Sequence, residues 1–186
     1  MSEIIRPARV EDAEAIGWIS VTAWRETYAG IMPDDYLAAL SIEQRAAAFR
    51  DRIAKPADRH AIFVALDGTD RAVGFGVSGP TRETSLGTDG EIFAINLVAA
   101  AKRQGLGLRL MAAMAAHLSN QNFAQAGLWV IDQNASARRF YETLGGHETT
   151  RKTQIFGAKS VLELGYAWHS VDELVSSTRQ LLRRRV

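Results

Sequence analysis

The segment Arg103–Leu108 combines a basic residue, two glycines and the predicted start of a helix, shortly after the apolar run Glu91–Val98. The first turn of a helix presents free backbone N–H groups and about half a positive charge. Glycines allow a phosphate group to approach that backbone closely. The segment therefore predicts a turn that binds a pyrophosphate.

Other interpretations of this turn remain open from its residues alone. A Walker loop requires Gly-x4-Gly-Lys-Ser/Thr, which the sequence does not contain. A dinucleotide fingerprint requires glycine or alanine where Leu110 stands, although Asp132 after the next predicted strand would suit the ribose-binding acid. Because short glycine patterns recur by chance, a strand–helix turn without a ligand is a further interpretation.

The residue types exclude several other chemistries. With no cysteine in the chain, disulfides, thiolate metal sites and cysteine nucleophiles are excluded. The four histidines stand at no metal-ligand spacing such as HExxH, so we expect no metal. Ser78 follows Gly76, but Pro80 stands where the second glycine of a Gly-x-Ser-x-Gly elbow is needed.

The elements that must position this turn alternate between strands and helices. Their order predicts a mixed central sheet with helices on its faces, of the α/β or α+β class. The polar segment 81–89 is expected to be a mobile loop. We expect strands at Glu3–Arg6, His60–Asp67, Ala72–Pro80, Glu91–Val98, Ala126–Ile131, His147–Thr153 and Ser160–Trp168. We expect helices at Ala13–Ala29, Asp35–Leu40, Ile42–Ile53, Gly105–Leu118, Asn134–Leu144 and Val171–Leu182.

Three motifs carry a resemblance to a known family. Residues 91–97, followed by Lys102-Arg103-Gln104-Gly105-Leu106-Gly107, resemble the acyl-CoA-binding core of the GNAT superfamily of N-acetyltransferases. The family pattern is Gln/Arg-x-x-Gly-x-Gly/Ala after a strand, and Lys102 replaces the usual first residue. Residues 134–145 resemble the family's N-x-x-A-x-x-F-Y-x-x-x-G helix, and Trp24-Arg25-x-x-Tyr28-x-Gly30-Ile31-x-Pro33 is similar to one bacterial branch.

The resemblance implies one GNAT domain over residues 1–170, with a basic helical extension at 171–186. Its mixed sheet would have about seven strands and helices on both faces. Acetyl-CoA would bind as co-substrate between the strands 91–98 and 126–131, with its pantetheine arm on the main chain of Leu97 and Ala99. The implied cofactor-binding residues are Leu97, Val98, Ala99, Lys102, Arg103, Gln104, Gly105, Leu106, Gly107, Leu108, Asn134, Ala137 and Arg139.

The resemblance also implies a base and an acid. Glu91 lies eleven residues before Lys102, which is the offset of the base glutamate in the histone-acetyltransferase branch. It would take the proton of the amine, directly or through a water. Tyr141 falls on the family's acid tyrosine and would protonate the leaving CoA thiolate. The structural alternatives are that Glu91 starts a strand facing solvent and that Tyr141 is one member of an apolar helix face.

The acceptor implied by the resemblance is a primary amine of a small molecule or peptide. In this fold the first two helices cover the acceptor side, so Trp24, Tyr28 and Asn96 are predicted to bind the substrate, with plain core packing as the alternative for the two aromatic residues. With no cysteine to carry the acyl group, direct attack in a ternary complex is expected. Family habit implies a homodimer.

Charge and composition narrow the class of protein. The chain has 186 residues, enough for one domain with a core. Residues 1–99 carry 10 basic and 15 acidic side chains, whereas residues 100–186 carry 12 and 6, which suits an anionic ligand in the second half. The pI of about 8.1 does not suggest nucleic-acid binding. No membrane-length apolar run or signal peptide is visible, so we expect a soluble, cytoplasmic protein.

Two competing functions remain as alternatives. A non-catalytic acyl-CoA sensor would keep the same binding turn without turnover, although the presence of both Glu91 and Tyr141 favours an enzyme. A dinucleotide-binding oxidoreductase is disfavoured by Leu110.

Overall fold

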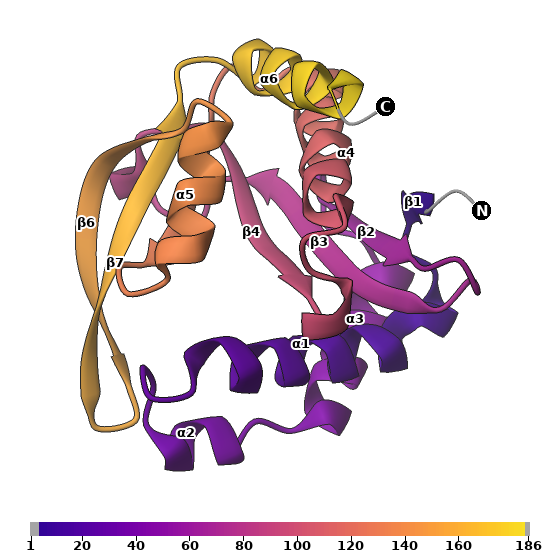
Figure 1. The fold of residues 1–186 in the computed structure, drawn as a ribbon, viewed down its shortest axis with the longest axis vertical. Helices are drawn as coiled ribbons and strands as arrows, with labels where there is room; N and C mark the ends of the chain where they lie inside the picture. The colour runs from indigo at the N-terminus through magenta and orange to yellow at the C-terminus, as the bar shows by residue number, and fades with distance from the viewer. Residues whose placement is uncertain (1–3, 185–186) are drawn as a thin grey trace.

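A seven-stranded mixed sheet forms the centre of the protein, which a computed structural model describes for residues 4–184 (Figure 1). Its order is β1-β2-β3-β4-β5-β7-β6, and each neighbouring pair is antiparallel except β4 and β5. The expected class is confirmed. The strands are β1 (Ile4–Pro7), β2 (Ala61–Leu66), β3 (Ala72–Pro80), β4 (Gly90–Leu97), β5 (Ala126–Ile131), β6 (His147–Phe156) and β7 (Lys159–Trp168).

Helices cover both faces of this sheet. Phe75 of β3 packs against Phe49 of α3, with ring centroids 5.1 Å apart, whereas a Cβ on the adjacent Gly76 would lie 2.7 Å from the Met114 sulfur of α4. Because successive strand residues point to opposite faces, α3 and α4 lie on opposite sides. The helices are α1 (Ala13–Tyr28), α2 (Asp34–Ala38), α3 (Ile42–Ala54), α4 (Leu106–Asn120), α5 (Ala135–Thr143) and α6 (Val171–Arg183).

The one parallel pair in the described sheet is very short. β4 and β5 are paired only at Gly90 with Ala126 and at Glu91 with Gly127. The carboxylate of Asp89 accepts hydrogen bonds from the N–H groups of Ala124 and Gln125, both at 2.8 Å, and so joins the starts of the two strands. Beyond this joint, no further β4–β5 pair is formed among the described residues, and the remainder of β4 has an open edge toward β5.

A register irregularity lies immediately after this joint. On the β3 side, Ser78 is paired with Ile92 and Val77 with Ala94, so Phe93 has no partner in the register. Such a bulge redirects the side chains that follow it and increases the local twist. It is consistent with the divergence of β4 from β5.

The segment 81–89 is not the free loop that its polar composition predicted. It contains a short 3-10 helix, Thr84–Leu86, and Leu86 is almost fully buried. Added Cβ atoms on Gly127 or Gly165 would meet the Leu86 side chain at 2.9 Å and 3.2 Å. One large apolar residue therefore holds the segment against β5 and β7.

The C-terminal helix belongs to the core rather than to the surface alone. Val171 and Leu174 are buried in the same cluster as Met114 and Leu118 of α4. Figure 1 shows α6 lying across one end of α4. Ser170 caps the helix by accepting the N–H of Glu173 at 3.1 Å.

The predicted strand residue Glu3 lies outside the described residues. Over residues 4–184, no helix is long and apolar enough to cross a membrane.

Candidate acyl-CoA site and acceptor face

The predicted pyrophosphate turn has the geometry of an open helix start. Gly105 adopts a left-handed conformation, with φ of 90°, and is the N-cap of α4 without a side-chain cap bond. Arg103 also has a positive φ, 67°, which is uncommon for a residue with a side chain. The backbone N–H groups of Leu106, Gly107 and Leu108 precede the first possible intrahelical bond. The turn can therefore donate several hydrogen bonds to one anion.

The turn is tied to α1 on one side. The Lys102 ammonium lies 3.2 Å from the Thr27 hydroxyl, and the Ala99 N–H donates to the Glu26 carboxylate at 3.0 Å. The main-chain N–H of Ala99, predicted to meet the pantetheine arm, is thus engaged by Glu26. Within the turn itself, the Gln104 amide donates to the Ala100 carbonyl at 2.6 Å. These contacts hold the turn in place next to the C-terminal part of α1.

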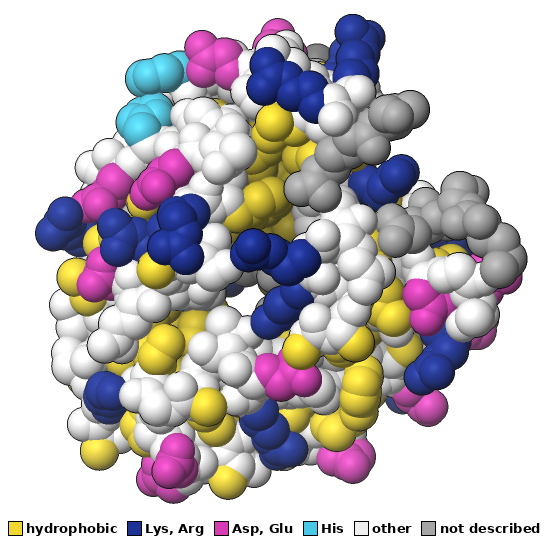
Figure 2. Space-filling view, in the orientation of Figure 1, with side chains coloured by type: hydrophobic (Ala, Val, Ile, Leu, Met, Phe, Trp, Pro, Cys, Tyr) yellow, Lys and Arg dark blue, Asp and Glu magenta, His cyan; other side chains and the backbone are white. Residues whose placement is uncertain are grey.

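Space remains in front of the turn. A Cβ on Gly107 would reach the Leu97 side chain at 3.4 Å, an ordinary contact, so a methyl fits there and a large side chain would enter the space beyond. Figure 2 shows a hollow near the middle of this face, with Lys and Arg side chains beside it. The predicted residues from Leu97 to Leu108 are therefore gathered in one continuous strand–turn–helix unit.

The other predicted cofactor residues lie on α5, which follows β5. The Asn134 side chain caps this helix by accepting the Ala137 N–H at 3.2 Å. Arg139 is exposed. The neighbouring Arg138 instead pairs with Asp132, at 2.9 Å between guanidinium and carboxylate, and so holds α5 against the end of β5.

Tyr141 is both a core residue and a candidate acid. It is 6% exposed, and its ring contacts Phe140, Tyr166 and Trp168. Burial raises the pKa of Tyr141 above the ordinary value of tyrosine, and the nearby Tyr28 raises it further. The hydroxyl therefore keeps its proton at neutral pH, which a proton donor requires. The ring of Tyr141 therefore packs in the core, as the structural alternative expected, and this packing does not exclude a role for the hydroxyl.

Glu91 does not face solvent, so that alternative is wrong. Its side chain is 1% exposed and lies next to the parallel joint. The carboxylate accepts the N–H of Arg82 at 2.9 Å and forms an ion pair with the Arg82 guanidinium, which also lies 4.5 Å from the Phe93 ring. In this arrangement the Glu91 oxygens are already occupied by donors from one residue.

Two of the predicted acceptor residues, Trp24 and Tyr28, lie toward the C-terminal end of α1, in an aromatic cluster with Tyr36 and Phe156. The ring centroids of Trp24 lie 5.0 Å from Tyr28 and 6.1 Å from Phe156. Burial raises the pKa of Tyr28, the Asn134 side chain lowers it, and the Glu163 carboxylate raises it further, leaving it above the ordinary value. Asn96 lies farther along β4, opposite Phe75 of β3.

The sequence reasoning did not single out Lys152, Glu163 and Trp129, which lie in the neighbouring strands β6, β7 and β5. Lys152 of β6 and Glu163 of β7 are paired across the hairpin, and the Lys152 ammonium lies 4.0 Å from the centre of the Trp129 ring. Lys152 and Glu163 are equally distant from the turn Gly157-Ala158, which is the signal that could have placed them side by side.

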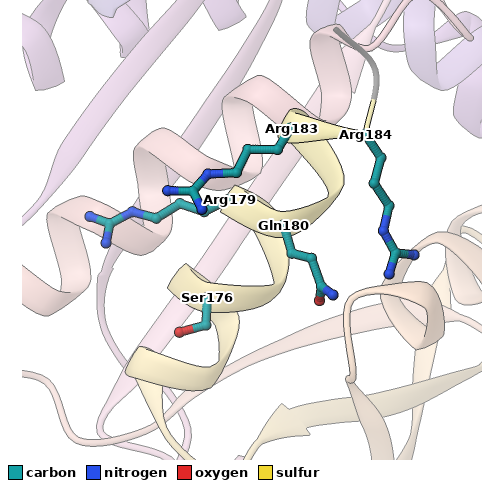
Figure 3. A pocket seen from close by; sticks show the side chains of 5 residues that line it. All are labelled: Ser176, Arg179, Gln180, Arg183 and Arg184. Carbon is teal, nitrogen blue, oxygen red and sulfur yellow. The ribbon is translucent and has the colours of Figure 1, made fainter.

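A separate pocket lies on α6. It has a volume of about 400 Å³ and is lined by four residues of this helix and by Arg184, which follows the helix (Figure 3). They are Ser176, Arg179, Gln180, Arg183 and Arg184. No group of three or more potential metal ligands occurs in the part of the chain that the structure describes.

Comparison with known proteins identifies the family. Residues 21–146 match the model of the acetyltransferase (GNAT) family. The uncharacterized N-acetyltransferase YuaI of Bacillus subtilis (strain 168) is 32% identical over 170 residues, covering 91% of this chain and 95% of YuaI. The PaiA N-acetyltransferase of Thermoplasma acidophilum, solved with coenzyme A, has a TM-score of 0.69 at 19% identity, covering 88% of this chain and 98% of that one.

A second solved structure gives the same fold. YncA of Salmonella typhimurium, solved with its cofactor acetyl-CoA, also has a TM-score of 0.69, at 18% identity, and the match covers 92% of this chain and 95% of YncA. The family model covers more than half of the chain, and the match to YuaI covers 91% of it. The chain therefore belongs to the GNAT family of acetyltransferases.

Proposed function

We propose that this protein transfers an acetyl group from acetyl-CoA to a primary amine by direct attack in a ternary complex. The observation that carries the proposal is the uncapped start of α4 at Gly105, which follows the end of β4 that is not paired with β5. The solved structures of PaiA with coenzyme A and of YncA with acetyl-CoA, which share this fold, support the same ligand.

The turn would bind the cofactor largely through its backbone. The N–H groups of Leu106, Gly107 and Leu108 would donate to the pyrophosphate, aided by the positive end of the α4 dipole. The open edge of β4 offers main-chain groups to the pantetheine arm, and one N–H there would stabilise the oxyanion that forms on the thioester. Because these groups belong to the backbone, Lys102 in place of the family's Gln or Arg does not weaken the proposal.

The side chains would move the protons. A protonated amine cannot attack, so a carboxylate on the acceptor face must first accept a proton, and Glu91 is the carboxylate that the family resemblance selects. Its ion pair with Arg82 occupies the carboxylate in this structure. Tyr141, which burial keeps protonated, would give its proton to the sulfur when the C–S bond breaks.

Substitution of Gly107 tests the binding turn. In Gly107→Trp the indole would fill the space in front of the helix start, so we expect acetyl-CoA affinity to fall at least about 100-fold, a loss of about 3 kcal/mol. Isothermal titration with acetyl-CoA measures it. Asn120→Trp, at the exposed end of the same helix, is the matched control and should bind like the wild type.

Turnover separates an enzyme from a sensor. The rate of thiol release from acetyl-CoA with a panel of primary amines should exceed the rate without an amine.

Tight acetyl-CoA binding by Gly107→Trp would refute the binding turn. Wild-type protein that binds acetyl-CoA but releases no thiol with any amine would support the sensor instead.

A further inference from the structure

Glu163 of β7 is a carboxylate whose neighbouring cation, Lys152, lies closer to another carboxylate. The side chain of Glu163 is 13% exposed, and the Lys152 ammonium lies 3.6 Å from its carboxylate. The same ammonium lies 2.6 Å from the carboxylate of Glu83. The shorter contact is to Glu83, so the ion pair of Glu163 is the long and weak one.

The position of Lys152 is fixed by a third contact. Its ammonium lies 4.0 Å from the centre of the Trp129 ring, a distance at which a cation is attracted to the aromatic face. Moving the ammonium closer to Glu163 would weaken the contacts to Glu83 and Trp129. A carboxylate that is mostly removed from water and only loosely paired is stabilised by any further cation that can reach it.

The surroundings of Glu163 connect it to the proposed reaction centre. Glu163 is paired with Ile131 at the end of β5, and Ile131 lies in the cluster against which Trp24 and Tyr28, the predicted acceptor residues, pack. The Glu163 carboxylate also raises the pKa of Tyr28, which agrees with this position. The carboxylate of Glu91, in contrast, is occupied by the guanidinium and the backbone N–H of Arg82.

The same sheet face contains an unused hydrogen-bond donor. The indole Nε1 of Trp129 is buried and has no partner among the described residues, and Trp129 lies in β5 two residues after Gly127 of the parallel joint. Trp129 is paired with Gly165 in β7, two residues from Glu163. A buried N–H without a partner is costly, so this donor can serve an acceptor group that approaches this face.

We propose that Glu163 receives the cationic ammonium group of the acceptor and takes its proton, with Lys152 withheld from it by Glu83 and Trp129. This inference rests on the proposed acetyltransferase function and assigns to that function an acceptor that arrives as a cation. Glu91 then keeps Arg82 and the β4 joint in place instead of acting as the base.

The charged groups around Glu163 suit a proton acceptor. Burial raises the pKa of Glu163, Lys152 lowers it, Glu83 raises it and Arg82 lowers it, with the net direction upward. Tyr28 approaches from α1 as a neutral hydroxyl. A carboxylate with a raised pKa is a better match for the proton of an ammonium than an ordinary one.

The protons balance through three groups. The ammonium loses one proton to Glu163, and the free amine attacks the thioester carbon to form the C–N bond. When the C–S bond breaks, the Tyr141 hydroxyl gives its proton to the sulfur. The second proton of the nitrogen then restores the Tyr141 hydroxyl, and Glu163 returns its proton to solvent.

Two isosteric variants test whether Glu163 or Glu91 is the carboxylate that accepts the proton. Wild type, Glu163→Gln and Glu91→Gln are compared for thiol release from acetyl-CoA, with 2-phenylethylamine as the probe acceptor, from about pH 6 to about pH 9. We expect Glu163→Gln to lower kcat about 100-fold and to abolish the fall in rate toward acidic pH. We expect Glu91→Gln to retain that acidic fall, and both variants to bind acetyl-CoA like the wild type.

Lys152→Gln provides a further readout that a structural role would not move. It removes the cation that lowers the Glu163 pKa, so the acidic fall in rate should move to higher pH. Unchanged kcat and pH profile in Glu163→Gln, loss of the acidic fall in Glu91→Gln, or failure of the acetyl-CoA-bound wild type to acetylate the probe would each overturn the assignment. If the wild type does not bind acetyl-CoA, the proposed function fails together with it.

Discussion

At the scale of single residues, Tyr141 shows how one side chain can serve both packing and chemistry. Its ring lies among Phe140, Tyr166 and Trp168, so the ring position is fixed by the core. The same burial raises the pKa of the hydroxyl, which stays protonated over the whole neutral range. Removing only the hydroxyl therefore separates the two contributions.

Tyr141→Phe should lower kcat about 100-fold while leaving acetyl-CoA affinity and the melting temperature nearly unchanged, because the ring and its contacts remain. Steady-state kinetics with a primary amine, titration with acetyl-CoA and thermal unfolding measure the three quantities.

The matched control is Tyr166→Phe. Its ring centroid lies 6.2 Å from that of Tyr141, and its hydroxyl donates to Glu142 at 2.7 Å. This variant should lose about 1 kcal/mol of stability with the hydrogen bond and keep kcat. Equal losses of kcat in both variants would assign the effect to packing and remove the acid role from Tyr141.

The local position of a residue, in a helix or in a turn, could be predicted from the sequence where the residue lay in a short motif. Asn134 was predicted to begin a helix, which it caps, Tyr141 lay within a helix motif, and Gly105 lay in a turn pattern. The ion pair of Glu91 with Arg82 was not predicted, because nothing in a single sequence says which of many arginines meets a given carboxylate. Pairing of this kind depends on how the strand bulges and where the connecting segment returns.

At the scale of elements, β4 and β5 are joined only at their starts, by two residue pairs, and diverge from there. Asp89 precedes β4 and accepts two N–H groups at the start of β5. Partial burial raises the pKa of Asp89, but the hydrogen bonds from Ala124 and Gln125 lower it more, and the carboxyl titrates below its ordinary range. The stability that this carboxylate adds is present above its unfolded pKa and is lost as the pH falls through the folded one.

Asp89→Ala should reduce the free energy of unfolding by about 1 kcal/mol at neutral pH, since two charge-assisted bonds are lost at an exposed site. The difference from wild type should shrink as the pH falls below about 4, the unfolded pKa, and should vanish once the pH is below the lower folded pKa, where Asp89 is protonated in both states. Urea unfolding at several pH values measures the difference. A difference that does not change with pH would show that the negative charge is not what joins the strands.

The elements themselves were largely predictable, because their apolar periodicity is strong. The strands 72–80 and 126–131 have the predicted bounds, and α1 differs by one residue from its prediction. The anchoring of segment 81–89 was missed, since one buried Leu86 in a polar stretch has no periodicity. The length of the β4–β5 joint could not be predicted from the motifs either, because strand pairing is a contact between segments that are distant in the sequence.

At the scale of the whole molecule, α6 completes a core that earlier elements leave open. Val171 and Leu174 are buried against α4, although the helix follows the last strand and carries a row of exposed arginines. The sequence pattern suggested a basic extension, which describes its outer face. Its inner face is part of the same cluster as Trp168 and Tyr141.

Removal of residues 171–186 should therefore unfold or aggregate the protein, because burial of a single leucine or valine is worth about 1.5–3 kcal/mol. Circular dichroism and size-exclusion chromatography of the shortened chain measure the effect. The triple variant Arg179→Gln, Arg183→Gln and Arg184→Gln changes only the outer face and should keep the wild-type melting temperature within about 2 °C. A shortened chain that folds and melts normally would show that α6 is dispensable.

The open edge of β4 has a consequence for colloidal behaviour. Most sheets keep unpaired strand edges at their borders, where charges, bulges or covering elements prevent another chain from adding a strand. Here an unpaired edge from Ile92 to Leu97 lies within the sheet, facing β5 across the divergence. In the proposed enzyme, the pantetheine arm of the ligand would cover this edge. Ligand binding would then also protect the protein against intermolecular strand addition, and the ligand-free state would be the aggregation-prone one.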